Sequence, residues 1–151
     1  MSIFRSMDIS ASGMSAQRFR MDVIAQNIAN EDNTRTADGT PYRRRVVVFQ
    51  ERREPYSSFA TYMDAAKGGL GGGGGGVRVM SVHEDTKTDF KLAYEPNHPD
   101  ADAEGYVRYP NVDREQELVD FLSAVRSYEA NVTALNNFKS MAMKALEIGS
   151  R

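Results

Sequence analysis

Titratable side chains cluster at two places where they could hold a metal ion or transfer protons. One cluster is His83-Glu84-Asp85, and the other is the segment 98–104, His-Pro-Asp-Ala-Asp-Ala-Glu. The chain has 2 histidines in all, so no second histidine stands at metal-ligand spacing from either one. The second segment also lacks the glycine and glutamate spacing of an EF-hand calcium loop. We therefore interpret the clusters as a solvated strand end and a polar turn, and we predict no catalytic residue, no metal ion and no cofactor.

A glycine run and an arginine run could bind phosphate groups. Gly71–Gly76 is followed by valine and arginine, whereas a P-loop continues with lysine and then serine or threonine. Arg43-Arg44-Arg45, together with Arg52 and Arg53, could bind phosphates or an acidic surface, but Glu51 and Glu54 can balance this charge. With 19 basic and 21 acidic residues, the chain is not strongly basic, as a nucleic-acid binder usually is. We expect a linker and a solvated strand, with contacts to an acidic neighbour in an assembly as the alternative, and neither a nucleic-acid partner nor a small-molecule substrate.

Length and composition narrow the class of protein. A chain of 151 residues suits one domain, or one small domain with appendages. It has no cysteine, which excludes disulfides, cysteine zinc sites and a thiol nucleophile. No apolar run approaches the roughly 20 residues that span a bilayer, and the first eight residues contain no apolar core of a secretory signal. If the protein leaves the cytoplasm, we expect a route without a cleaved signal peptide.

The first region, residues 1–33, has the pattern of an amphipathic helix. Met7, Met14, Met21 and Ile28 are spaced by seven residues, and Ile24 lies near the same stripe. Such a spacing is typical of a helix that packs along a heptad seam. Asparagine and acidic residues after position 29 favour a turn, so we expect the helix to stop around residue 30.

Residues 34–110 change period and predict a small β-rich insert. Stretches at about 42–50, 77–82, 90–94 and 106–109 carry β-branched or aromatic residues, and the second of them alternates apolar and polar positions. Between the first two stretches, residues 64–76 are rich in glycine, and we expect them to form a flexible loop.

Residues 111–151 predict a second and longer helix, from Asp113 to about Ile148. Asn111 or Asp113 can cap its first turn, and Gly149 is a natural stop. The apolar residues of this helix fall into two heptad rows. One row contains Leu118, Val125 and Val132, and the other contains Phe121, Tyr128 and Leu135.

These regions together predict an α+β fold, in which two long terminal helices form a coiled-coil-like pair and a small β-rich insert carries the glycine-rich loop. An isolated amphipathic helix is marginal in water and needs a packing partner. A two-helix pair still leaves apolar surface uncovered, and exposed apolar patches usually mark interaction sites. We therefore predict self-assembly or a protein partner. The predicted assembly interface comprises Met7, Met14, Met21, Ile24, Ile28, Leu118, Phe121, Val125, Tyr128, Val132 and Leu135.

Three stretches resemble one known family. Asn27-Ile28-Ala29-Asn30 resembles the signature of bacterial flagellar axial proteins, the rod and hook proteins and their relatives. The stretch 94–107, which begins Tyr-Glu-Pro-Asn-His-Pro, resembles the basal-body rod proteins of the proximal-rod type, the FlgC family. The segment 123–132, with Tyr128 and Asn131, is similar to the C-terminal helix motif of that family. The resemblance covers nearly the whole chain outside residues 51–76.

The resemblance implies a structural subunit and no enzymatic activity. Proteins of this family assemble into the proximal rod of the flagellar basal body, a helical tube in the periplasm that transmits torque and surrounds the export channel. The implied partners are further copies of the chain, other flagellar rod proteins, and the membrane ring and export gate of the basal body. Such proteins travel unfolded through the flagellum's own type III export apparatus, which would explain the absence of a cleaved signal peptide.

Two other classes of protein remain open from the residues alone. Heptads beside a small β-domain also fit a coiled-coil adaptor that binds a ligand or peptide and forms a closed oligomer. A wall-cutting enzyme would need paired carboxylates or a metal site in a cleft, and no such constellation stands out. A polymer that grows with concentration favours the rod subunit, whereas a fixed dimer or trimer favours the adaptor.

Overall fold

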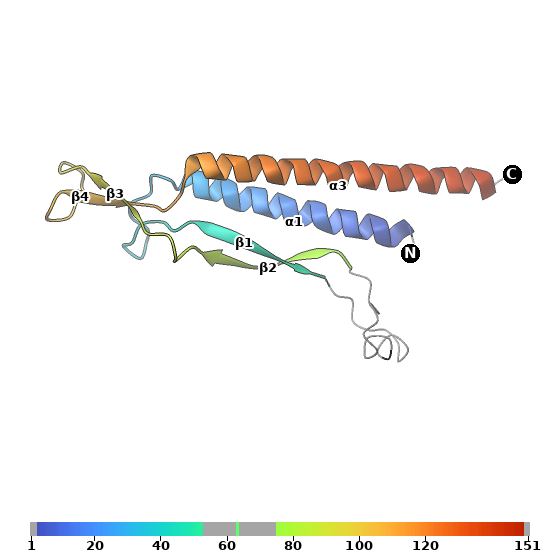
Figure 1. Ribbon diagram of the computed structural model, residues 1–151, viewed down its shortest axis with the longest axis horizontal. Helices are drawn as coiled ribbons and strands as arrows, with labels where there is room; N and C mark the ends of the chain where they lie inside the picture. Colours follow the sequence, from blue (N-terminus) through green and yellow to red (C-terminus); the bar gives the residue numbers. More distant parts are fainter. Residues whose placement is uncertain (1–2, 53–62, 64–74, 150–151) are drawn as a thin grey trace. The chain divides into compact units, whose positions relative to one another are not determined.

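Two long helices and two small antiparallel sheets make up the described structure (Figure 1). This computed structural model describes residues 3–52, 63 and 75–149. The elements confirm the predicted α+β class and the four predicted strands, whereas most of the predicted flexible loop at 64–76 lies outside the described residues. In chain order they are α1 (Ile3–Ala29), β1 (Arg45–Glu51), β2 (Val77–Glu84), β3 (Lys91–Tyr94), β4 (Tyr106–Tyr109) and α3 (Arg114–Gly149).

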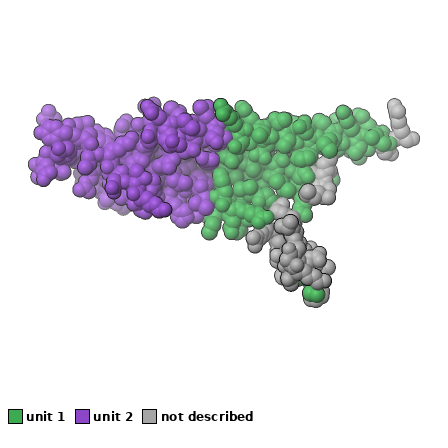
Figure 2. Space-filling model, viewed as in Figure 1, with its two compact units in different colours: residues 1–18, 49–80, 125–151 green, residues 19–48, 81–124 purple. Residues whose placement is uncertain are grey.

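The chain divides into two compact units, coloured separately in Figure 2. The first unit contains residues 1–18, 49–80 and 125–151, and the second contains residues 19–48 and 81–124. Each unit therefore combines a part of α1, a part of the strand region and a part of α3. None of the described helices is long and apolar enough to cross a membrane.

The helices α1 and α3 contact one another within each unit. In the second unit, Arg20 and Asn27 of α1 bind Asp120 and Glu117 of α3, so the two helices are antiparallel there. In the first unit, Gly13 of α1 lies against Asn131, and a Cβ atom at Gly13 would lie 2.9 Å from the Asn131 Oδ1 atom. Gly13 costs α1 helix propensity, but its missing side chain permits this close approach.

The row of α3 that packs within the chain differs from both predicted heptad rows. Leu118 is 48% exposed and does not belong to the row that packs within the chain. The contacts within the chain instead follow the series Glu117, Ala124 and Asn131, which lies one residue before the row of Leu118. Glu117 and Ala124 are fully buried, and Asn131 lies against Gly13. Apolar periodicity cannot identify such a row, because the row contains a buried carboxylate and an asparagine.

The strands form two separate ribbons. Strand β3 pairs antiparallel with β4, and Lys91 faces Tyr109 while Tyr94 faces Tyr106. Strands β1 and β2 form the other sheet. The backbone N–H of Val77, at the start of β2, donates to the hydroxyl of Ser12 in α1 at 3.0 Å. Gly76 precedes this contact with a φ of 105°, and a side chain there would collide with Ser12.

The start of α3 is capped as the sequence predicts. The Asp113 carboxylate accepts a hydrogen bond from the backbone N–H of Glu115 at 3.1 Å. Glu115 and Glu117 lie in the first turn, where the partial positive charge of the helix dipole favours them. Val112 is fully buried just before the cap, so α3 leaves the β3–β4 ribbon from a fixed position.

Candidate functional site: a buried polar cluster and exposed helix faces

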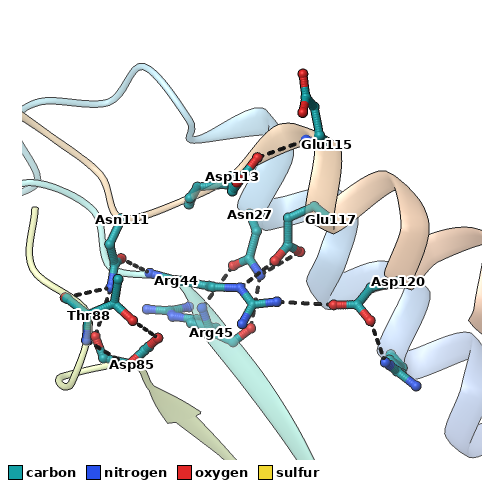
Figure 3. Close-up of polar contacts among 12 residues, drawn as sticks. Asn27, Arg44, Arg45, Asp85, Thr88, Asn111, Asp113, Glu115, Glu117 and Asp120 are labelled. Atoms are coloured by element: carbon teal, nitrogen blue, oxygen red, sulfur yellow. Dashed lines mark hydrogen bonds and ion pairs between the residues drawn. The ribbon is translucent and has the colours of Figure 1, made fainter. Parts of the chain in front are cut away.

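Asn27, the first residue of the predicted family motif, lies at the centre of a buried polar cluster (Figure 3). It is 1% exposed. Its Oδ1 accepts hydrogen bonds from the Tyr42 hydroxyl and the Arg45 backbone N–H, each at 2.9 Å. Its Nδ2 donates to the Arg45 backbone carbonyl at 2.9 Å and to the Glu117 Oε2 atom at 3.0 Å. The amide thus uses its two donors and both acceptor positions.

The carboxylate of Glu117 is fully buried and paired with Arg44. The Arg44 Nε donates to Glu117 Oε1, and the Arg44 Nη2 donates to Asp120 Oδ2 at 3.1 Å. Arg20 of α1 binds the other oxygen of Asp120 at 3.1 Å. Removing one partner from such a buried pair leaves a charge uncompensated, which is strongly destabilising.

The electrostatics of the cluster favour its charged and hydrogen-bonded forms. Burial lowers the pKa of the Arg44 guanidinium, but the hydrogen bond and charge of Glu117, together with the charge of Asp120, outweigh this effect and raise the pKa above its ordinary value. Burial also raises the pKa of Tyr42, so its hydroxyl keeps the proton that it donates to Asn27.

Asn111 joins the same cluster to the end of β2. Its Oδ1 accepts from the Arg44 backbone N–H at 2.8 Å, and its Nδ2 donates to the Asp85 and Thr88 carbonyls at 2.9 and 3.2 Å. The Asp85 carboxylate in turn accepts bonds from the Thr88 hydroxyl and from the backbone N–H groups of Lys87 and Thr88. These bonds lower the pKa of Asp85. The cluster therefore ties α1, β1, the turn after β2 and the start of α3 together.

The other candidate residues do not form a reaction centre in the described part of the chain. The His83 ring shares a hydrogen bond with the Ser81 hydroxyl on an exposed strand end, at 2.7 Å. The His98 Nδ1 accepts from the Asp100 backbone N–H, and the Asp102 carboxylate accepts from two backbone N–H groups of its own turn. No group of three or more metal-ligating side chains occurs among the described residues.

The arginine run was only partly understood from the sequence. Arg43 stacks on Phe90, with its guanidinium carbon 4.2 Å from the ring centre, and Arg45 pairs with Glu84 at 3.5 Å on the surface. Arg44 instead turns inward to Glu117 and Asp120, so the expectation of a solvated strand is wrong for this residue. Sequence reasoning also missed Tyr42, Glu117 and Asn111 as members of the cluster. The one sequence signal for the cluster was Glu117, a charged residue seven positions before Ala124 and therefore on the same face of α3.

The residues of the predicted assembly interface lie on several faces of the two helices. Ile24 is buried, whereas the methionines of α1 and Ile28 are half-buried. On α3, the row of Phe121, Tyr128 and Leu135 is half-buried, as are Val125 and Val132. Of the motif residues at the end of α1, Ala29 is exposed and Asn30 is half-buried. Large apolar side chains that are more than one-third exposed include Phe4, Leu118, Val119, Leu122, Met141, Met143, Leu146 and Ile148.

Comparison with known proteins gives matches over the whole chain. A FlgC basal-body rod protein of Bacillus subtilis is 50% identical over 99% of this chain and 99% of its own length. The FlgC proteins of Borreliella burgdorferi and Salmonella typhimurium are 45% and 44% identical, and in each alignment at least 98% of both chains is covered. This chain belongs to the FlgC family of flagellar basal-body rod proteins.

Two family models match separate segments of this rod protein. The flagella basal body rod protein model covers residues 7–35, and the flagellar basal body rod FlgEFG protein C-terminal model covers residues 103–148. The buried hydrogen bond from Asn27 to Glu117 joins the two matched segments. Arg44, which also binds Glu117, comes from the region between them. In this FlgC-family chain, the motif asparagine therefore joins the two matched segments to one another and to the β1 strand.

Proposed function

We propose that the chain is a structural subunit of the proximal rod, which stacks with further copies and with other rod proteins into a helical tube. The observation that carries the proposal is the 50% identity to a basal-body rod protein over 99% of both chains. The tube would transmit torque along its length and surround the export channel. Subunits that pack by many helix contacts are suited to this task because close-packed interiors transmit strain.

The proposed assembly surface is built from the two terminal helices. The predicted coiled-coil-like pairing of α1 and α3 within the chain is part of this proposal, and the hydrogen bonds of Asn27 and Arg20 to α3 support it. Exposed apolar side chains along α3, such as Leu122 and Leu146, support packing against neighbouring subunits.

The proposed setting is the periplasmic part of the basal body. The membrane ring and the export gate would be partners below the rod, and the chain would reach its place through the flagellar export apparatus without a cleaved signal peptide. The intact mass of the chain in isolated basal bodies tests this route. A mass that corresponds to the whole sequence agrees with it, whereas a mass that lacks an N-terminal segment contradicts it.

Sedimentation of the purified chain over a wide concentration range tests the proposed function itself. A rod subunit should form open polymers that grow with concentration, because its contacts do not close. A fixed dimer or trimer at all concentrations would contradict the proposal and favour an adaptor with a closed oligomer.

A further inference from the structure

The face of α1 that points away from α3 carries a regular series of exposed residues. At 100° per residue, this face lies about half a turn from Gly13, Arg20 and Asn27, which contact α3. The series has the alternating spacing of three and four residues that lets one helix pack along another. All of its members are exposed except Ala11, which is half-buried. This α1 outer seam comprises Phe4, Asp8, Ala11, Ser15, Arg18, Asp22, Ala25 and Ala29.

Helix α3 carries a matching series beside its packed row. Leu118, Val125 and Val132 each come one residue after Glu117, Ala124 and Asn131, and the remaining members lie one helical turn from another member of the series. The series therefore lies about 100° around the helix axis from the packed row. Val125 and Val132 are half-buried, and the other members are exposed. This α3 outer seam comprises Leu118, Leu122, Val125, Glu129, Val132, Asn136, Lys139, Met143 and Leu146.

The two seams are complementary when the helices are antiparallel. If Leu118 lies opposite Ala29, every later position of the α3 outer seam falls opposite a position of the α1 outer seam, because the spacings mirror one another. Large side chains then oppose small ones along much of the length. The facing pairs are Leu118 with Ala29, Leu122 with Ala25, Val125 with Asp22, Glu129 with Arg18, Val132 with Ser15, Asn136 with Ala11, Lys139 with Asp8 and Met143 with Phe4.

Charge selects this register over its neighbours. Glu129 faces Arg18 and Lys139 faces Asp8, and among the described residues none of these four forms an ion pair within the chain. A shift by one heptad in one direction places Glu129 opposite an alanine and Asp8 opposite a valine. A shift in the other direction places Lys139 opposite a serine. Neither shifted register joins opposite charges, so complementarity favours the first one.

We propose that the α1 outer seam of one copy packs antiparallel on the α3 outer seam of a second copy, in this register. The proposal rests on the proposed rod function and names the partner of its helix surface as a second copy of this chain. The one unfavourable pair, Val125 with Asp22, lies where Asp22 can turn toward solvent because it is exposed.

The register also predicts the geometry of the array. Within the chain Gly13 lies against Asn131, so Ala11 is level with about residue 133 of its own α3. In the proposed contact, Ala11 faces Asn136 of the second copy, three residues further along. The second copy is therefore displaced by about 4.5 Å along the helix axis relative to the first copy. Heterologous contacts that repeat with a displacement do not close, and they generate a helical filament.

Cysteine cross-linking in isolated basal bodies tests the register. The chain has no cysteine, so introduced thiols are its only ones. We expect a variant with both Ser15→Cys and Val132→Cys to give a ladder of covalent multimers after mild oxidation, on a gel run without reductant. The matched control, Ser15→Cys with Val125→Cys, represents a register shifted by one heptad and should give no ladder.

A charge exchange provides a second measurement that does not depend on cross-linking. Arg18→Glu and Glu129→Arg should each abolish swarming, and the double variant should restore it, since both residues are exposed and neither forms an ion pair within the described part of the chain. A double variant no better than the single ones, or single variants that swarm normally, would overturn the proposed pairing.

The outcomes separate this proposal from the rod function. Assembled rods with no ladder from the first cysteine pair, or an adduct with a different protein in place of multimers, would overturn the contact between copies and leave the rod function intact. Normal motility in a strain without the chain would overturn the rod function.

Discussion

At the scale of single residues, the fold depends on side-chain amides and charges that are buried but fully paired. Asn27 makes four hydrogen bonds to three other residues while 1% exposed. A buried donor or acceptor that loses its partner costs roughly 1–3 kcal/mol, which exceeds the net gain from a typical hydrogen bond. The identity of this residue therefore matters more than its size.

Replacing Asn27 should be far more damaging than replacing its exposed neighbour. Asn27→Ala leaves the Tyr42 hydroxyl and both backbone groups of Arg45 without their partner, so we expect the free energy of unfolding to fall by about 2–4 kcal/mol. The control Gln26→Ala changes an exposed residue and should stay within about 0.5 kcal/mol of the natural chain. Urea unfolding followed by circular dichroism measures both, and equal midpoints for the two variants would refute the role of the cluster.

Alkaline pH should destabilise the chain through Tyr42. Burial raises the pKa of this phenol, so its contribution to stability is fully present below its unfolded value, 10.0, and is lost as the pH rises through the folded pKa. The free energy of unfolding, measured between about pH 9 and pH 12, should therefore fall more steeply for the natural chain than for Tyr42→Phe. Parallel pH profiles for the two proteins would show that Tyr42 does not contribute in this way.

At the scale of helices and strands, the absence of a side chain at Gly13 lets α1 and α3 approach one another closely. Gly13 leaves room for Asn131, whose Nδ2 donates to the Ser127 carbonyl at 2.8 Å. An added methyl group at Gly13 would push this side chain from its place and disturb that bond. The gain in helix propensity from alanine and the cost of the displaced asparagine thus oppose each other.

A double-mutant cycle separates these two effects. Gly13→Ala normally stabilises a helix by about 1 kcal/mol, but here we expect little or no gain. In the background of Asn131→Ala the same substitution should recover its usual benefit, which gives a coupling of about 0.5–1.5 kcal/mol between the two sites. Thermal unfolding of the four proteins measures the coupling, and additive effects would mean that the two residues do not contact one another.

The elements were largely predictable from the sequence, and the polar cluster was not. Stretches of β-branched and aromatic residues predicted all four strands, and Asp113 marked the start of α3. Apolar periodicity selected the row of Leu118, whereas the α3 residues in contact with α1 include Glu117 and Asn131, one residue before that row and its continuation. A carboxylate is buried there only because Arg44, distant in sequence, reaches it. Pairing of that kind depends on the tertiary fold, which composition and spacing along one segment do not contain.

At the scale of the whole molecule, both helices have more apolar surface than the single chain covers. Leu122 is 57% exposed and Leu146 is 74% exposed on α3, and Phe4 is 72% exposed on α1. A subunit of an open polymer is expected to show such surfaces because each contact is completed by a neighbour. In the proposed rod, folding and assembly would therefore use different faces of the same helices.

Substitutions on the two faces of α3 should separate folding from assembly. Leu122→Asp changes an exposed position, so we expect the free energy of unfolding to change by less than about 0.5 kcal/mol while motility is lost. Leu135→Asp places a charge at a half-buried position in the row of Phe121 and Tyr128 and should destabilise the chain by about 2–3 kcal/mol. Circular dichroism and swarming assays of both variants test the distinction. Normal swarming of Leu122→Asp would contradict it.

Electron microscopy of basal bodies from a strain that lacks this chain tests the rod function most directly. We expect that the membrane ring forms but that no rod extends from it, and that restoring the intact gene restores the rod. Complete rods and hooks in the strain without the chain would contradict the proposed rod function.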